Sequence, residues 1–211
     1  MVFLGLMKIK FCGITNIDDA IDAVSFNVDA IGFIFVKNSP RYISPEKAEE
    51  IAMNIPPFIQ LVGVFADHDQ QEIIDIATRC KLDLIQLHGD ESPSFCLSMP
   101  RRVIKAFRIS DLDDIQNIAS YQGVVAAVLL DTFVEGMNGG TGKTFDWGLA
   151  LQAKEYEIPI ILSGGINSSN IKKAINLVNP YAVDISSSIE AEPGKKDYNK
   201  MKELIDIANT L

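Results

Sequence analysis

The sequence contains few cysteines, histidines and basic residues, and each shortage argues against a class of protein. Three cysteines among 211 residues suit a reducing cytosol better than a disulfide framework. Lys and Arg total 19 against 28 Asp and Glu, so a net charge of −9 repels the nucleic-acid backbone, and no basic cluster offsets it. The two histidines, His68 and His88, are twenty residues apart, and no cluster of metal ligands surrounds them. We therefore expect a cytoplasmic protein that binds neither nucleic acid nor metal.

Long apolar runs are also missing from the sequence. No segment approaches the ~18 uninterrupted apolar residues of a membrane span, so we expect no membrane partner. The apolar start of the chain lacks a basic leader and runs directly into Lys8 and Lys10, which argues against a signal peptide. Met7 offers an alternative start, which would make residues 1–6 an N-terminal extension.

Short apolar runs alternate with amphipathic stretches along the whole chain. The runs are rich in Val, Ile and Phe and end in Gly, Pro, Ser or Asp, as buried strands do. Between the runs, apolar residues recur at helical spacing, as Ile17, Ala20 and Val24 do. Asn16 and Asp197 are expected to cap the first and last helices. The expected strands are residues 9–12, 30–35, 60–65, 83–87, 103–107, 124–130, 159–162 and 181–185.

Eight strand–helix units predict a parallel sheet, because helical crossovers make successive strands parallel. Both an open doubly wound sheet and a closed barrel fit this pattern. Eight units of roughly 26 residues favour closure. No linker interrupts the series, so we expect one α/β domain over residues 1–211, a (β/α)₈ TIM barrel with short loops. The longest loops, residues 36–44 and 131–146, follow strands at the end where barrel enzymes keep their catalytic groups.

Cys12 ends the first predicted strand, and two readings of it remain open. Strand alternation places Lys10 on the same face, so its ammonium would favour the thiolate and lower the pKa of Cys12. The alternative is a small buried hydrophobic residue, which is the usual place of a free cysteine. We expect that second role for Cys80 and Cys96.

Two aspartates at or within apolar runs need an explanation. Asp131 follows a long apolar run, and its position alone fits a loop-starting residue, a helix cap or a catalytic acid. Asp184 interrupts the eighth run, and an interior carboxylate needs a partner. We expect an ion pair between Asp184 and Lys10 inside the barrel, which would also tune Cys12.

Small residues follow the seventh and eighth strands, where barrels commonly bind phosphate through backbone N–H groups and a helix N-terminus. Gly164 with Gly165, and Ser186 to Ser188, therefore predict a phosphorylated small-molecule substrate. Residues 139–144 end like a nucleotide-binding loop, but that motif requires glycine where Met137 stands. We expect a flexible lid over the barrel mouth instead.

Eight short motifs, in chain order from residue 8 to about residue 197, are specific as a set. They are Lys10-Phe11-Cys12-Gly13-Ile14-Thr15, Ser39-Pro40-Arg41-Tyr42-Ile43, Gln86-Leu87-His88-Gly89, Leu129-Leu130-Asp131, Gly139-Gly140-Thr141-Gly142, Phe145-Asp146-Trp147, Leu162-Ser163-Gly164-Gly165 and Pro193-Gly194-Lys195-Lys196-Asp197. Together they resemble the phosphoribosylanthranilate isomerase family over nearly the whole chain.

The resemblance implies a barrel enzyme of tryptophan biosynthesis that needs no cofactor. Such an isomerase converts N-(5-phosphoribosyl)anthranilate to 1-(2-carboxyphenylamino)-1-deoxyribulose 5-phosphate by an Amadori rearrangement. The resemblance implies that Cys12 is the general base, that Asp131 is the general acid, and that Arg41 holds the anthranilate carboxylate. The other substrate-binding residues that we predict are Gln86, His88, Gly164, Gly165, Asp184, Ser186 and Ser187.

The chain departs from the family pattern at Ser188, where glycine is usual. If that glycine has a positive φ or lets phosphate approach the backbone, serine would strain the eighth loop. If the glycine only begins the next turn, serine is tolerated. Two alternative functions are a non-catalytic phosphate-binding barrel and another sugar-phosphate enzyme, such as indole-glycerol-phosphate synthase. The sequence favours neither a monomer nor a homodimer.

Overall fold

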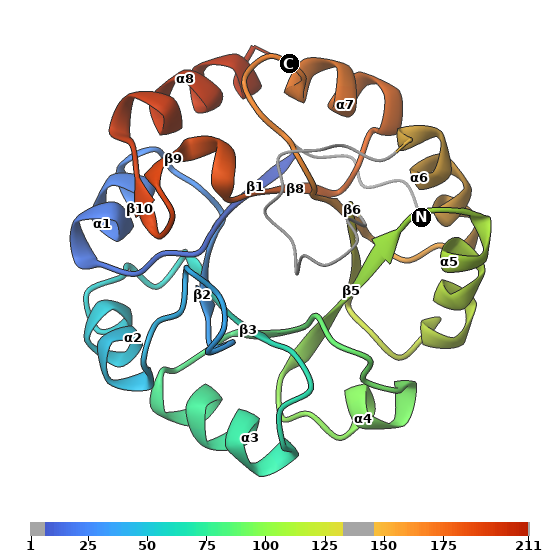
Figure 1. Cartoon of the computed structure of the whole chain (residues 1–211), viewed down its shortest axis with the longest axis horizontal. Coiled ribbons are helices and arrows are strands. Elements are labelled where there is room, and N and C mark those ends of the chain that lie inside the picture. Colours follow the sequence, from blue (N-terminus) through green and yellow to red (C-terminus); the bar gives the residue numbers. More distant parts are fainter. Residues whose placement is uncertain (1–6, 133–145, 211) are drawn as a thin grey trace.

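Eight parallel strands form a closed barrel in chain order, and β8 completes it by pairing with β1 (Figure 1). The computed structural model describes residues 7–132 and 146–210. The proposed extension at residues 1–6 and the proposed lid at residues 139–144 lie outside that part of the chain. The strands are β1 (Lys8–Cys12), β2 (Ala30–Ile34), β3 (Gln60–Phe65), β4 (Leu84–Leu87), β5 (Arg102–Ile109), β6 (Ala127–Thr132), β7 (Ile160–Leu162) and β8 (Ala182–Ile185).

Helices surround the barrel, which confirms the predicted single-domain (β/α)₈ fold (Figure 1). The larger helices are α1 (Ile17–Ser25), α2 (Pro45–Ala52), α3 (Gln70–Arg79), α4 (Pro93–Leu97), α5 (Leu112–Gln116), α6 (Trp147–Ala153), α7 (Ile171–Val178) and α8 (Tyr198–Ala208). Short 3₁₀ segments are η1 (Asn117–Tyr121), η2 (Lys154–Tyr156) and η3 (Ser187–Ile189), and the loop after β8 also carries a hairpin of β9 (Glu190–Glu192) and β10 (Lys195–Lys196).

Local sequence explains where the helices begin. The side chain of Asn16 accepts from the backbone N–H of Asp19 at the start of α1, and Asp197 does the same for Lys200 at the start of α8. Both caps were predicted, and each satisfies one of the N–H groups that the first helical turn leaves free. Pro45 occupies the first turn of α2, where its missing N–H costs nothing.

The sixth strand differs from its prediction. It runs from Ala127 to Thr132, so its start lies later than the predicted residue 124. Val124 and Val125 instead donate backbone N–H groups to Tyr121 in the turn that follows η1. The strand also ends later than the predicted residue 130, so Asp131 lies within it, which excludes the loop-starting and helix-cap interpretations of this residue.

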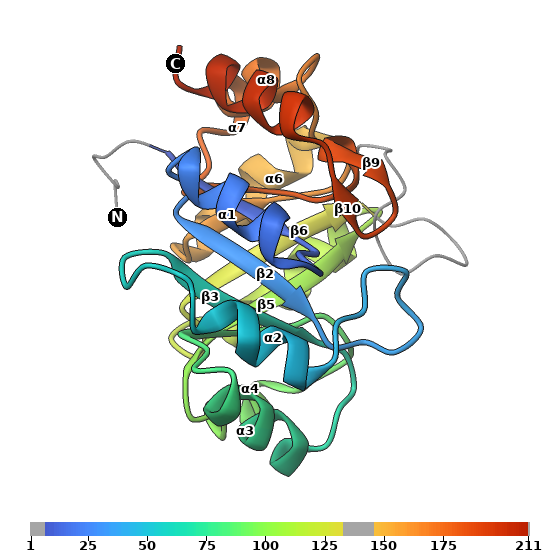
Figure 2. The same ribbon diagram turned by 90° about the vertical axis from the view of Figure 1, so that its left-hand side faces the viewer.

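Two layers of apolar side chains hold the barrel together. Inward-facing residues such as Val62, Ile104 and Leu129 fill its centre, and a larger cluster packs between the strands and the helices. Alternation along the strands then brings polar residues into the interior at the carboxyl ends. The loops after β2 and β8 project from this same end (Figure 2). No helix in residues 7–132 and 146–210 is long and apolar enough to cross a membrane.

Candidate active site

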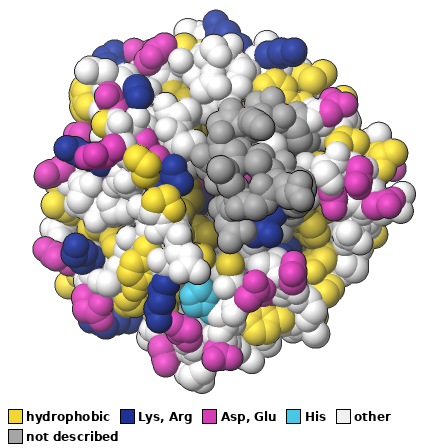
Figure 3. Space-filling view, viewed as in Figure 1, with side chains coloured by type: hydrophobic (Ala, Val, Ile, Leu, Met, Phe, Trp, Pro, Cys, Tyr) yellow, Lys and Arg dark blue, Asp and Glu magenta, His cyan; other side chains and the backbone are white. Residues whose placement is uncertain are grey.

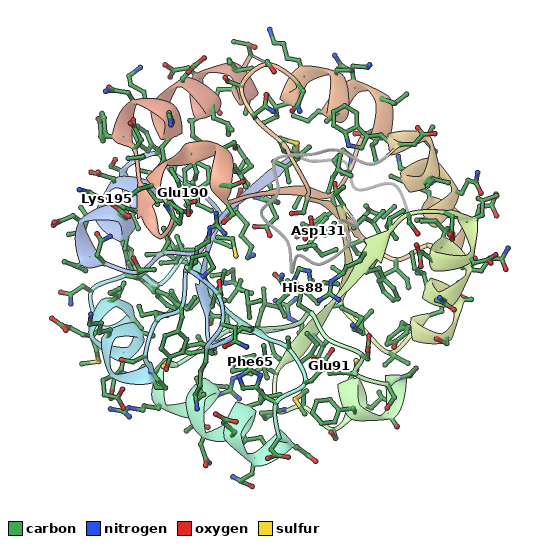
Figure 4. The ribbon with its side chains drawn as sticks, in the orientation of Figure 1. Phe65, His88, Glu91, Asp131, Glu190 and Lys195 are labelled. Atoms are coloured by element: carbon green, nitrogen blue, oxygen red, sulfur yellow. The ribbon has the colours of Figure 1, made fainter. Side chains whose placement is uncertain are left out.

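The carboxyl ends of the strands form a polar mouth at one end of the barrel. His88 and Asp131 lie close together near its centre, and Glu190 approaches from the loop after β8 (Figure 4). In the space-filling view of this face, acidic side chains are spread around the periphery while basic side chains also reach towards the centre (Figure 3). Cys12 lies at this mouth, at the end of β1.

Cys12 is 5% exposed, and its thiol lies beside a buried ion pair. Lys10 Nζ donates to Asp184 Oδ1 at 2.9 Å, and their side chains are 4% and 6% exposed. This confirms the predicted pair between β1 and β8, whose strand register also places the two residues opposite each other. The charges of both residues act on the thiol from close range.

Burial raises the pKa of the Cys12 thiol, and the nearby Asp184 carboxylate raises it further. The Lys10 ammonium and, more weakly, Lys196 act in the opposite direction without overcoming the burial. The prediction that Lys10 would leave Cys12 with a lowered pKa was therefore wrong. The cation is in place as predicted, but the apolar surroundings and the paired carboxylate outweigh it.

Gly32 leaves the space that the Cys12 side chain needs. It is the register partner of Cys12 on β2, and a Cβ at this position would lie 2.8 Å from Cys12 Sγ and 3.2 Å from Lys10 Nζ. Real Cβ atoms do not approach sulfur so closely, so any larger residue would displace the thiol.

Asp131 faces inward from β6 and is 5% exposed. Its Oδ1 accepts from the backbone N–H of Thr132 at 2.8 Å, and its Oδ2 lies 3.4 Å from His88 Nε2. Gly164 packs directly against this carboxylate, since a Cβ there would lie 3.0 Å from Oδ1 and collide with Thr132. Gly164 has a positive φ as well, so both the backbone and the space at this position require glycine.

Gln86 connects this carboxylate side of the mouth to Lys10. Its Oε1 accepts from Lys10 Nζ at 3.0 Å, and its Nε2 lies 3.3 Å from His88 Nδ1. Gln86 is 1% exposed, and both of its polar atoms already have partners inside the protein. Direct contact of Gln86, Asp184 or His88 with a substrate stays a prediction. The side chain of His88 is partly exposed, whereas Gln86 and Asp184 are buried.

Arg41 is held in place by Glu190. Its Nε and Nη2 donate to the two carboxylate oxygens of Glu190 at 2.8 and 2.7 Å. Lys196 Nζ donates to the same carboxylate at 3.0 Å and to the backbone oxygen of Cys12 at 2.7 Å. Although burial opposes it, these hydrogen bonds and charges hold the pKa of Glu190 below its ordinary value, while burial lowers the pKa of Lys196.

Sequence reasoning did not select Glu190 or Lys196. Both are buried charged residues, and their importance follows from contacts with Arg41 and Cys12, which are far away in the chain. The available signal was the position of Lys196 within a motif of the family and of Glu190 two residues after the last serine of the eighth loop.

The loops after β7 and β8 lie side by side and present small residues. Gly164 and Gly165 both have a positive φ, and Ser186 Oγ donates to the backbone oxygen of Cys12 at 3.1 Å. Ser188 has no positive φ and lies in η3, and its Oγ donates to the backbone oxygen of Ile166 at 2.6 Å. Serine therefore does not strain this loop but ties it to the loop after β7.

A side cavity of about 420 Å³ opens beside His88, between the loops after β4 and β5. Arg108, the register partner of Asp131, lines it and donates from Nη2 to the backbone oxygen of His88 at 3.2 Å. Phe107, Tyr121 and Lys105 form further parts of the lining. The mouth thus combines the Cys12 thiol, the Asp131 carboxylate, three cations held by carboxylates and two adjoining loops of glycines and serines. Such a set can exchange protons with a bound anion.

Comparison with known proteins assigns this arrangement to one family. The family model described as N-(5'-phosphoribosyl)anthranilate (PRA) isomerase matches residues 9–207. N-(5'-phosphoribosyl)anthranilate isomerases of Geobacter metallireducens and Thermotoga neapolitana are 47% and 45% identical to this chain. The alignments cover 95% and 98% of this chain and 98% and 100% of those proteins.

Solved structures give the same result. The crystal structure of phosphoribosyl anthranilate isomerase from Thermotoga maritima has a TM-score of 0.91 and 42% identity, and the match covers 97% of this chain and 100% of that one. A second isomerase structure, in complex with reduced 1-(o-carboxyphenylamino)-1-deoxyribulose 5-phosphate, has a TM-score of 0.88 and 40% identity with the same coverage. A further Thermotoga maritima structure is described as monomers generated from a dimeric isomerase.

Proposed function

The chain belongs to the N-(5'-phosphoribosyl)anthranilate isomerase family, and on that premise we propose that Cys12 is its general base and Asp131 its general acid. The reaction is the Amadori rearrangement of N-(5-phosphoribosyl)anthranilate in tryptophan biosynthesis. The observation that carries the two assignments is that both side chains face the same mouth from the carboxyl ends of β1 and β6. At this end of a barrel, loops and strand ends supply the reacting groups.

The rearrangement needs one acid and one base at different atoms of the sugar. Asp131 gives its proton to the ribose ring oxygen while the bond from that oxygen to C1 breaks, and the anthranilate nitrogen supplies electrons to form a protonated Schiff base. The Cys12 thiolate then removes the proton from C2, and the electrons return to the nitrogen to give an enolamine. Loss of the proton on the C2 hydroxyl and gain of a proton at C1 complete the ketose.

The raised pKa of Cys12 sets an energetic cost for the second step. With an ordinary thiol pKa of 9.0, forming the thiolate at pH 7 costs about 2.7 kcal/mol, and burial adds to that cost. The Lys10 ammonium and the Lys196 ammonium favour the thiolate and limit this penalty. A positioned base contributes ~10²–10⁴ in rate, which corresponds to about 2.7–5.5 kcal/mol and is comparable to this cost.

The substrate carries a carboxylate at one end and a phosphate at the other, and the mouth offers cations and backbone N–H groups that can bind such anions. We propose that Arg41 holds the anthranilate carboxylate and that Gly164, Gly165, Ser186 and Ser187 hold the phosphate through their loops. In support, the ligand of the isomerase complex described above carries both a carboxyl group and a phosphate. Of the three other predicted binding residues, we propose that His88 lines the site while Gln86 and Asp184 support it from beneath.

The test replaces each reacting group and follows anthranilate fluorescence during turnover. Cys12→Ala and Asp131→Asn should each lose at least about 100-fold in kcat, because each removes a positioned proton-transfer group. Both variants should still bind reduced 1-(o-carboxyphenylamino)-1-deoxyribulose 5-phosphate.

A matched control is Cys96→Ala, since Cys96 is a buried cysteine outside the mouth and should keep its turnover. Near-normal kcat in Cys12→Ala or Asp131→Asn would refute the role assigned to that residue. Inactivity of the unmodified protein would favour the non-catalytic phosphate-binding alternative.

A further inference from the structure

A row of polar contacts crosses the barrel interior from β8 to β6. It runs from Asp184 to Lys10 at 2.9 Å and from Lys10 to Gln86 at 3.0 Å. It continues from Gln86 to His88 at 3.3 Å and from His88 to Asp131 at 3.4 Å. Four of these five residues are at most 6% exposed, so water does not compete for their contacts. The row connects the charges beside the proposed base to the proposed acid.

The Lys10 ammonium determines which atoms donate and which accept along this row. An ammonium can only donate hydrogen bonds, so the atom of Gln86 that faces Lys10 must be Oε1. The amide nitrogen of Gln86 therefore faces His88 Nδ1, and that nitrogen also can only donate. His88 Nδ1 must accept, which leaves the neutral ring with its proton on Nε2. The orientation of the amide thus follows from the Lys10 cation, and the tautomer follows from the contact between the amide nitrogen and His88 Nδ1.

The Nε2–H of His88 has no well-formed partner in the described part of the chain. It is buried, and Asp131 Oδ2 at 3.4 Å is too poorly placed for a good hydrogen bond. The other oxygen of Asp131 already accepts from Thr132 N–H at 2.8 Å. A buried donor without a partner costs about 1–3 kcal/mol, so its presence calls for an explanation. Catalytic hydrogen bonds are often long in an empty site and shorten when substrate binds.

We propose that Lys10, acting through Gln86, fixes the tautomer of His88, so that His88 is a positioning residue that presents Nε2–H to the carboxylate of Asp131. The proposal rests on the proposed role of Asp131 as general acid. When Asp131 gives its proton to the ribose ring oxygen, both of its oxygens become acceptors. Thr132 N–H then stabilises Oδ1 and His88 Nε2–H stabilises Oδ2. Fixed donors at a group where charge develops are among the larger contributions to catalysis.

The tautomer can be measured directly, because the chain has only two histidines. The whole protein is labelled with ¹⁵N-histidine, and the ring nitrogen shifts distinguish protonated from unprotonated positions. His88→Gln identifies the His88 signals, and His68 serves as an internal control. We expect His88 to be protonated at Nε2 and not at Nδ1.

In Gln86→Glu, where a carboxylate faces Nδ1, we expect a proton on Nδ1. A proton on Nδ1 in the unmodified protein, or an unchanged ring in Gln86→Glu, would overturn the proposal.

Measurements of kcat and KM test whether the Nε2–H donor of His88 acts through Asp131. His88→Leu should lower kcat by about 10²-fold, as loss of one fixed donor does, with a smaller change in KM. His88→Gln keeps an N–H group near Nε2 and should recover part of that loss. Added to Asp131→Asn, His88→Leu should cause no further loss, because the carboxylate it serves is gone.

These outcomes distinguish the positioning role of His88 from the proposed role of Asp131 as general acid. Normal kcat in His88→Leu together with an inactive Asp131→Asn would reject the positioning role alone. An active Asp131→Asn would instead reject the proposed acid, and the tautomer measured by ¹⁵N shifts would still report whether Lys10 and Gln86 fix the ring.

Discussion

Cys12 illustrates how the surroundings of one residue decide its chemistry. Two cations favour its thiolate, while burial and the Asp184 carboxylate favour the thiol, and the second pair of effects prevails. A raised pKa means that the Cys12 thiol is mostly protonated at neutral pH. The ammonium groups of Lys10 and Lys196 limit the cost of forming the thiolate.

The raised pKa of Cys12 predicts how the thiol titrates with pH. Below that pKa, each unit of pH changes the thiolate fraction tenfold, so the thiolate fraction should rise with pH through the neutral range. The midpoint of this rise should lie above the ordinary thiol value of 9.0, measured from the ultraviolet absorbance of the thiolate as the difference between the unmodified protein and Cys12→Ala. Initial rates do not report this pKa alone, because kcat/KM also requires the proposed acid in its protonated form, which becomes rarer as the pH rises. A midpoint below 9.0 would contradict the balance of burial and charge described around Cys12.

The loops that follow β1, β2 and β8 act as one structural element. The β9–β10 hairpin reaches back to the end of β1, where Lys196 Nζ donates to the backbone oxygen of Cys12, and to the loop after β2, where Gly194 lies against Pro40 and Arg41. Glu190 accepts from both Arg41 and Lys196, so one buried carboxylate orients two cations at the mouth. Removing either cation leaves the carboxylate with the other, which limits the damage to the fold.

Arg41→Met tests the role assigned to the loop after β2. Loss of a hydrogen bond to a charged group costs about 1.5–3 kcal/mol, which corresponds to roughly a 10- to 100-fold increase in KM. The effect on kcat should be smaller, because the carboxylate that Arg41 is proposed to hold is remote from the reacting atoms. Lys47→Met removes an exposed cation from α2 and should leave KM unchanged. An unchanged KM in Arg41→Met would show that another group holds the anthranilate carboxylate.

Closure of the barrel is a property of the whole molecule. Lys10 and Asp184 meet only because β8 pairs with β1, and the last helix, α8, packs against α7 and α1 to cover that seam. Leu204 of α8 is 1% exposed and belongs to the main apolar cluster. The stability of the seam therefore depends on residues from both ends of the chain.

Leu204→Ala should lower the free energy of unfolding by about 2–5 kcal/mol, because it leaves a cavity in a closely packed layer. Leu97→Ala is the matched control, since Leu97 is 65% exposed and should change stability by less than about 0.5 kcal/mol. Denaturant unfolding followed by circular dichroism measures both values. Equal effects of the two substitutions would contradict the packing described for α8.

Local pattern in the sequence determined most of the fold. Apolar periodicity located the strands and helices, Asn16 and Asp197 capped the helices they were predicted to cap, and alternation placed Lys10 and Cys12 on one inward face. These features depend on neighbours within a few residues, so they can be read from the chain. The start of the sixth strand was misplaced, because the valines before it are as apolar as strand residues and only the turn after η1 removes them from the barrel.

The tertiary structure alone decided the electrostatics of the mouth. The direction of the Cys12 pKa shift, the hold of Glu190 on Arg41 and the row of contacts from Lys10 to Asp131 all join residues that are far apart in sequence. Burial and charge act through space. A barrel brings eight strand ends to a common point, and the sequence around each strand does not show which side chains will meet there. The sequence by itself therefore identified the two residues that are proposed to react, and the closed barrel set the direction of the Cys12 pKa shift and the partners of both residues.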